Sequence, residues 1–99
     1  MAPSARYNEN NSHFDPPMRL SDLPRRTSAT VERVEDRMLN DPIARRLREL
    51  GFVDGETVQL MAFGPIGAEP LLVQVGFTRF ALRRSEAARV VLRNGDARE

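Results

Sequence analysis

Cysteine and tryptophan are absent from this chain of 99 residues, and so is lysine, because all 15 basic residues are arginine. Without cysteine there is no disulfide, no thiol nucleophile, no iron–sulfur ligation and no cysteine-based zinc site. The length suffices for one domain with a modest core. No apolar run approaches the roughly 20 residues that span a bilayer, and the polar N-terminus lacks the hydrophobic stretch of a signal peptide. A cytoplasmic location without direct membrane insertion is therefore the default expectation.

An excess of charge of one sign is also lacking, since the 15 arginines and 14 acidic residues leave a formal net charge of +1. Such a chain has no large field to attract nucleic acid or an anionic membrane. The preference for arginine over lysine is explained more simply by coding bias than by selection for bidentate contacts. A single tyrosine and no tryptophan leave few rings for stacking on bases, so nucleic acid is an unlikely partner.

The strongest local signal is a helix over residues 42–50. Asp41 can cap its first amide groups, and Pro42 fits the first helical position, where no N–H is needed. Gly51 supplies a left-handed C-cap. The apolar positions fall at i, i+4 and i+7 on one stripe: Ile43, Leu47 and Leu50. Short helical turns are expected near residues 20–23 and 85–88.

Strands account for most of the remaining pattern. The β-branched residues of 27–34 favour a first strand, and residues 90–92 a last one. Three segments between them alternate with period two, which indicates half-buried antiparallel strands. The residues expected to face inward are Val58, Leu60 and Ala62, then Leu71, Val73 and Val75, then Phe80 and Leu82. Turns are expected at residues 64–67 and at Gly76-Phe77. Five short strands joined by tight turns predict a mainly β fold, a small closed or nearly closed five-stranded barrel with the helix inserted.

The ends of the chain lack periodicity. Residues 1–17 are polar and turn-rich and are interpreted as a flexible tail, and residues 94–99 as a frayed C-terminus. The domain is therefore expected at residues 18–93. The alternative that translation begins at Met18 stays open.

The order of short motifs along the chain resembles the FeoA family of small bacterial proteins associated with ferrous iron uptake. The similarity covers nearly all of residues 18–93, and its specificity comes from the series and not from any one piece. The matching segments are residues 18–23 (MRLSDL), 29–34 (ATVERV), 46–52 (RLRELGF), 54–58 (DGETV), 69–71 (EPL), 75–76 (VG), 81–83 (ALR) and 86–87 (EA).

This resemblance implies an SH3-like barrel with an inserted helix. It also implies a cytoplasmic accessory role to FeoB, the membrane GTPase transporter of the same iron system. One departure is visible at Arg25-Arg26, where the family usually has a glycine. Glycine permits a positive φ at that turn, whereas arginine pays a steric penalty for the same conformation.

The residue types needed for a metal site or for catalysis are scarce. His13 is the only histidine and lies in the proposed tail, and Glu35-Asp36 is typical of a solvated turn. Ser21 and Ser85 lack a histidine partner in sequence and lie where helix caps are expected. The glycines form no phosphate-binding loop. No catalytic residue, no metal ligand and no cofactor is therefore assigned, and the protein is not expected to be an enzyme.

Two surfaces are candidates for partner binding. The first consists of Arg45, Arg46 and Arg48 on the predicted helix, which could dock a partner or insert an arginine into a GTPase site. The competing interpretation is a solvated helix face with an Arg45–Glu49 pair. The second is apolar and lies out of phase with the inward positions or in the turn: Met61, Phe63, Ile66 and Leu72. Exposed together they would mark an interface with a partner or a second copy, whereas a strand bulge would bury them.

The leading hypothesis is an accessory or regulatory adaptor of a ferrous iron uptake system that binds the cytosolic region of FeoB. It would meet the inner membrane only through that partner, and self-association stays open. The alternative is an SH3-like nucleic-acid-binding or transcription-regulatory module, which lacks a recognition-helix unit here. A third hypothesis, an iron carrier, requires stoichiometric ferrous iron binding.

Overall fold

The computed structural model describes residues 18–93 as five antiparallel strands, two α-helices and one 3₁₀ turn. The strands are β1 (Thr27–Val34), β2 (Thr57–Ile66), β3 (Glu69–Val75), β4 (Thr78–Leu82) and β5 (Val90–Leu92). The helices are α1 (Pro42–Leu50) and α2 (Arg84–Ala87), and the 3₁₀ turn is Leu20–Asp22. The predicted mainly β class and the inserted helix are confirmed. The proposed tail (1–17) and frayed end (94–99) lie outside the described residues.

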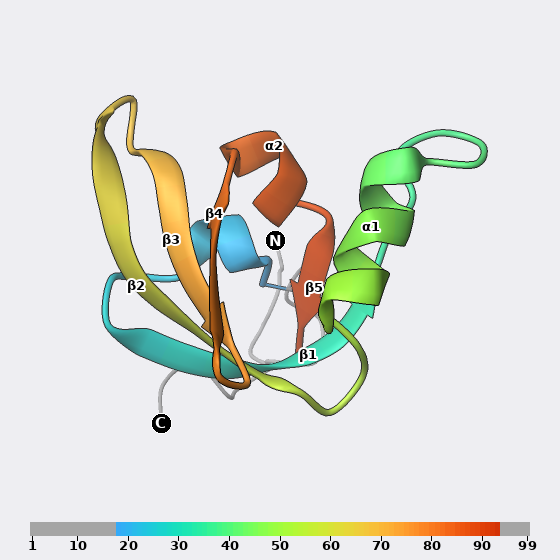
Figure 1. Cartoon of the computed structure of the whole chain (residues 1–99), viewed down its shortest axis with the longest axis horizontal. Coiled ribbons are helices and arrows are strands. Elements are labelled where there is room, and N and C mark those ends of the chain that lie inside the picture. The colour runs from blue at the N-terminus through green and yellow to red at the C-terminus, as the bar shows by residue number, and fades with distance from the viewer. Residues whose placement is uncertain (1–17, 94–99) are drawn as a thin grey trace, which may run out of the picture.

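The five strands form one strongly bent sheet in the order β4-β3-β2-β1-β5 (Figure 1). Strand β1 makes the bend possible, because its first half pairs with β2 and its second half with β5. A register shift between Val31 and Arg33 accompanies the change of partner. No ladder joins β4 to β5 within residues 18–93, so the SH3-like sheet stays open on that side, where α2 connects the two edge strands.

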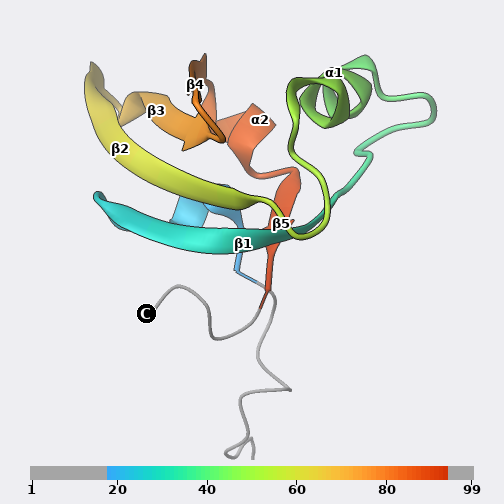
Figure 2. The ribbon, with the colours of Figure 1, turned by 60° about the horizontal axis from the view of Figure 1, so that its bottom comes forward.

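The concave side of the sheet holds the hydrophobic core, with α1 lying over it (Figure 2). Burying this apolar surface is the main stabilising contribution to the fold. Alternate residues of β3 are buried as their period-two pattern predicts. Phe52, which follows α1, is fully buried and its ring centroid lies 5.9 Å from that of Phe80 on β4. The largest fully buried apolar side chains are Phe52, Leu20, Leu23, Leu60, Leu71 and Leu92.

A bulge in β2 changes which of its residues face the core. Leu60 pairs with Val73, but the next pair is Ala62 with Leu72, so the register shifts by one residue at Met61. Such an extra residue reverses the side-chain alternation beyond it. Phe63 therefore lies opposite the buried Leu71 and packs against the core. The prediction that Ala62 continues the inward set is wrong, because Ala62 lies beyond the bulge.

The hairpin between β2 and β3 turns later than the sequence predicts. Strand β2 continues through residues 64–66, and the turn itself is made by Gly67 and Ala68, which have φ values of 62° and 61°. Gly64 is thus a strand residue and not a turn residue. A Cβ placed on Gly64 would lie 2.1 Å from the carbonyl oxygen of Glu69, so glycine is required there by the close approach of the two strands.

The turn that enters β1 contains the departure noted in the sequence. Arg26 has a φ of 63°, in the left-handed region that glycine tolerates best. Its N–H donates to the carbonyl oxygen of Leu60 at 2.7 Å, which fixes the turn against β2. Arginine therefore adopts here a conformation that glycine would adopt without steric cost.

The two short helical segments are capped by acidic residues and not by the serines. The N–H of Arg19 donates to Asp22 at 3.0 Å, and the N–H of Arg83 donates to Glu86 at 2.8 Å. The expectation that Ser21 and Ser85 act as caps is wrong. In each segment a carboxylate three residues downstream reaches back to the residue before the turn, an arrangement that stabilises helix starts.

Candidate partner-binding surface

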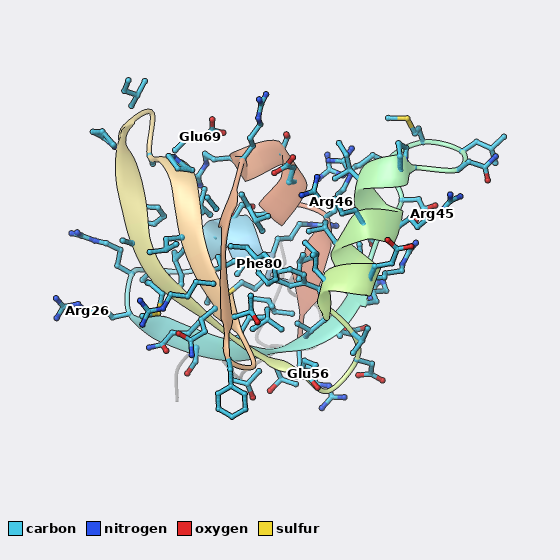
Figure 3. All side chains as sticks on the ribbon, in the orientation of Figure 1. Arg26, Arg45, Arg46, Glu56, Glu69 and Phe80 are labelled. Atoms are coloured by element: carbon cyan, nitrogen blue, oxygen red, sulfur yellow. The ribbon has the colours of Figure 1, made fainter. Side chains whose placement is uncertain are left out.

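A groove of about 680 Å³ lies between α1 on one side and β4 with the start of α2 on the other. We call it the α1–β4 groove. Figure 3 shows Phe80 pointing from β4 toward α1, into the space between these elements. Five large apolar side chains that line it are buried or half-buried: Ile43, Leu47, Leu50, Phe80 and Leu82. Its charged lining consists of Arg46, Arg79, Arg83 and Glu86.

The wall formed by α1 is fixed by one buried carboxylate. Asp41 accepts hydrogen bonds from the N–H groups of Arg37 at 2.8 Å, Ile43 at 3.0 Å and Ala44 at 3.4 Å. It also accepts from Nε of Arg89 at 2.8 Å. Gly51 ends the helix with a φ of 117°. The N-cap, the first-turn proline and the glycine C-cap predicted from the sequence are all confirmed.

Among the ion pairs of residues 18–93, only that of Asp41 with Arg89 is buried, since both side chains are almost inaccessible to solvent. The backbone N–H of Arg37 and the guanidinium of Arg89 hold the pKa of Asp41 well below its usual range. Arg89 also donates to the carbonyl oxygen of Ser85 at 2.8 Å, in α2. The carboxylate therefore stays ionised and links α1 to the segment that joins α2 with β5.

The three helix arginines do not form one surface. Arg46 lies on the side of α1 that faces α2 and lines the α1–β4 groove, whereas Arg45 points away from it (Figure 3). Arg48 donates to the carbonyl oxygen of Val34 at 2.8 Å and pairs with Asp36. Its role is thus to fasten α1 to the end of β1. Only Arg46 of the three combines exposure with a place in the groove.

Neither Arg45 nor Arg46 has an ion pair within residues 18–93. The Arg45–Glu49 pair weighed from the sequence is therefore not formed in the described part of the chain. Among the described residues, no carboxylate forms an ion pair with the guanidinium of Arg46.

The four apolar residues of the β2–β3 hairpin are likewise divided. Phe63 is half-buried and packs against the core because of the bulge. Met61 and Leu72 are half-buried, and Ile66 is 82% exposed at the tip of the hairpin. Of the four, Ile66 alone is among the strongly exposed residues of the described chain.

Several exposed or groove-lining residues escaped the sequence interpretation. Arg79 and Arg83 lie on either side of the inward residues Phe80 and Leu82 and line the groove. The alternation of residues in this segment predicts a strand, but it does not indicate that a groove lies beside that strand. Leu39 is 90% exposed and Phe77 is fully exposed. Both lie in turns, where hydrophobic periodicity does not predict which side chains are buried.

The described part of the chain does not bring a set of metal ligands together. No group of three or more His, Asp or Glu side chains within residues 18–93 could hold a metal ion. Glu35 is engaged with Arg19 at 2.7 Å and Arg33 at 2.8 Å, and these guanidiniums lower its pKa. No helix among residues 18–93 is long and apolar enough to cross a bilayer.

These features define a small SH3-like domain with an open groove. The model of the FeoA domain matches residues 18–94, and the chain belongs to the FeoA family. The family is associated with ferrous iron transport. No curated protein matches the chain significantly.

Solved structures agree with this assignment. FeoA of Stenotrophomonas maltophilia, solved with zinc, is 70% identical over 77% of this chain and 89% of that chain, with a TM-score of 0.73. It is described as an SH3 domain protein and a candidate activating factor of bacterial ferrous iron transport. The FeoA protein of Chlorobium tepidum is 29% identical over 79% and 70% of the two chains, with a TM-score of 0.66. A manganese-dependent transcriptional repressor is 18% identical over 80% of this chain and 42% of its own, with a TM-score of 0.63, and it shares the fold alone.

Proposed function

We propose that this protein is an accessory adaptor of a ferrous iron uptake system that binds the cytosolic region of the FeoB-type GTPase transporter. The observation that carries the proposal is the α1–β4 groove, because a FeoA-family chain associated with iron transport here presents an apolar floor bordered by arginines that form no ion pair within residues 18–93. Apolar surface that a domain leaves exposed beside charged groups is typical of a protein interface.

The proposal places the protein on the cytosolic side and gives it a binding role without catalysis. Its contact is with the transporter and not with iron, since the residues lining the groove include one carboxylate and no histidine. A divalent transition metal is normally held by several such ligands together.

Arg46 is the residue most suited to dock the partner, because it lines the groove and keeps its guanidinium free of ion pairs within residues 18–93. A rim charge of this kind steers association and fixes orientation more than it adds affinity. To act in the nucleotide site of the GTPase, the guanidinium of Arg46 would have to extend to the transferring phosphate, whereas docking requires only contact at the surface. We therefore assign Arg46 to docking.

The test uses the full chain and the purified cytosolic region of the FeoB-type transporter from the same genome, at cellular ionic strength. Calorimetry and surface plasmon resonance should both detect a complex. Arg46→Glu should weaken it roughly tenfold, while the matched variant Arg45→Glu, on the far side of α1, should leave the affinity nearly unchanged.

Absence of association in both assays would overturn the proposal. Salt-dependent retention of the wild-type chain on DNA or RNA would support the nucleic-acid alternative instead. Equal weakening by Arg45→Glu and Arg46→Glu would show that general charge, and not the groove, governs the binding.

A further inference from the structure

Strand β4 is an edge strand of the sheet and also one wall of the α1–β4 groove. Edge strands carry a row of backbone N–H and C=O groups that another chain can pair with. In β4 the register shows which groups these are. Val75 and Thr78 flank the two-residue turn, and the ladder continues through Gln74 with Arg79 and Val73 with Phe80.

Opposite residues in an antiparallel ladder alternate between bonded and non-bonded pairs, and the pair beside a two-residue turn is bonded. Thr78, Phe80 and Leu82 therefore use their backbone groups toward β3. Arg79 and Ala81 direct theirs to the open side, and both residues line the groove. No other backbone hydrogen bond within residues 18–93 uses these groups.

The side chains of β4 alternate in character as well as in direction. Leu82 is buried and Phe80 half-buried on the core side, while Arg79, Ala81 and Arg83 are exposed. A strand added to this edge would present its own side chains alternately to the two faces. One set would meet Phe80 and the apolar side of α1, and the other would meet the arginines.

The charged residues that line the groove indicate an occupant that carries negative charge. Its lining carries three arginines and one glutamate, and Glu86 already accepts the N–H of Arg83. No ion pair within residues 18–93 involves Arg46, Arg79 or Arg83. Arg79 donates through Nε to Gln74 at 3.1 Å, which orients its guanidinium without neutralising it.

We infer that the α1–β4 groove binds an extended partner segment in which acidic and apolar residues alternate, paired in β-fashion with the edge of β4. The segment lays its apolar side chains over Phe80 and α1 and its carboxylates beside Arg79 and Arg83. These two arginines are four residues apart, about 13 Å along a strand, so about five residues of the segment suffice. The inference rests on the proposed function only where it takes the segment to come from the transporter. The preference of the groove for an alternating acidic and apolar segment does not depend on that function.

The first experiment titrates the full chain against a fluorescein-labelled peptide of alternating glutamate and leucine, six residues long and flanked by glycine and serine. Fluorescence anisotropy should show saturable binding that weakens with added salt. A peptide in which lysine replaces glutamate, and one in which the same residues are blocked as three leucines followed by three glutamates, should bind at least tenfold more weakly. Equal binding of all three peptides would overturn the inference.

The second experiment tests the backbone pairing. Ala81→Pro removes an edge N–H that β3 does not use, and proline is tolerated at a strand edge. Its matched control, Ala81→Ser, keeps the N–H. We expect the proline variant to lose roughly fivefold to tenfold in peptide affinity and the serine variant to lose less than twofold. Equal affinities would show that the peptide does not add to the strand.

Charge reversal keeps the inference testable if the proline variant fails to fold. Arg79→Glu and Arg83→Glu should each lower the affinity for the acidic peptide and raise the affinity for the lysine peptide, whereas Arg45→Glu should change neither affinity. Concentration-dependent dimerisation of the wild-type chain that prevents the acidic peptide from binding would assign the groove to a second copy and overturn the inference. If the transporter region binds but Arg79→Glu and Ala81→Pro have no effect on it, the inference fails while the proposed function stands. If the peptides bind and the transporter region does not, the proposed function fails alone.

Discussion

Replacing Arg26 with glycine should stabilise the protein. The backbone of Arg26 has a φ of 63°, which places its Cβ close to its own carbonyl oxygen. The side chain is exposed and forms no hydrogen bond or ion pair among residues 18–93, so its removal sacrifices little. The hydrogen bond that fixes the turn is donated by the backbone N–H to Leu60 and survives the substitution.

The magnitude follows from two opposed contributions. An L-residue in the left-handed region costs roughly 1–2 kcal/mol, which glycine avoids. Glycine in turn gives the unfolded chain more freedom, which costs about 0.4–1 kcal/mol. From the middle of each range, the net gain in the free energy of unfolding is roughly 0.8 kcal/mol. For a domain of this size that raises the melting midpoint by about 2–8 °C.

Urea and thermal unfolding of the full chain measure this difference, and two control variants separate its causes. Arg26→Ala removes the same side chain but keeps the strained backbone, so its stability should stay within about 0.5 kcal/mol of wild type. Arg25→Gly places the glycine where φ is not positive and should lower stability by about 0.4–1 kcal/mol. If Arg26→Gly is no more stable than Arg26→Ala, the strain argument is refuted.

Three further outcomes follow from the core and the α1 cap. The backbone N–H of Arg37 and the guanidinium of Arg89 lower the folded-state pKa of Asp41, so the stability that this carboxylate confers is fully present above its unfolded pKa and is lost as the pH falls from there through the folded pKa. The wild-type melting midpoint should therefore drop on acidification below about pH 4, and Asp41→Asn should flatten this dependence and lower the midpoint at neutral pH. Phe63→Ala should destabilise the fold by at least about 1 kcal/mol more than Met61→Ala in urea unfolding, and the reverse order would contradict the bulge. Phe52→Ala should cost about 3–5 kcal/mol, and a loss below 1 kcal/mol would show that the ring is not central to the core.

Local chemistry made part of the fold predictable. Helix α1 begins and ends at the predicted residues because Asp41, Pro42 and Gly51 act within one turn of its ends. The alternation of β3 and β4 needed only the period-two pattern. The SH3-like arrangement of the strands came from the resemblance to a family, since strand order is set by contacts between residues far apart in sequence.

The errors arose where a distant contact decides the outcome. No local sequence signal predicts that a bulge lies at Met61. The bulge nevertheless turns Phe63 inward and takes Ala62 out of the inward set. The helix arginines looked equivalent because the sequence does not say where α1 docks. Docking places Arg46 beside β4 and ties Arg48 to Asp36 at the end of β1.

The bond between Asp41 and Arg89 has a consequence for the order in which the domain can be completed. These residues are 48 positions apart, and the carboxylate that starts α1 depends on a guanidinium that arrives just before the last strand. Forming such a contact requires closure of a long loop, which is slow relative to the formation of a helix. A partly synthesised or partly unfolded chain would thus have strands β1–β4 but no firmly seated α1. The α1 wall of the groove would then be completed late, once the segment that carries Arg89 is in place.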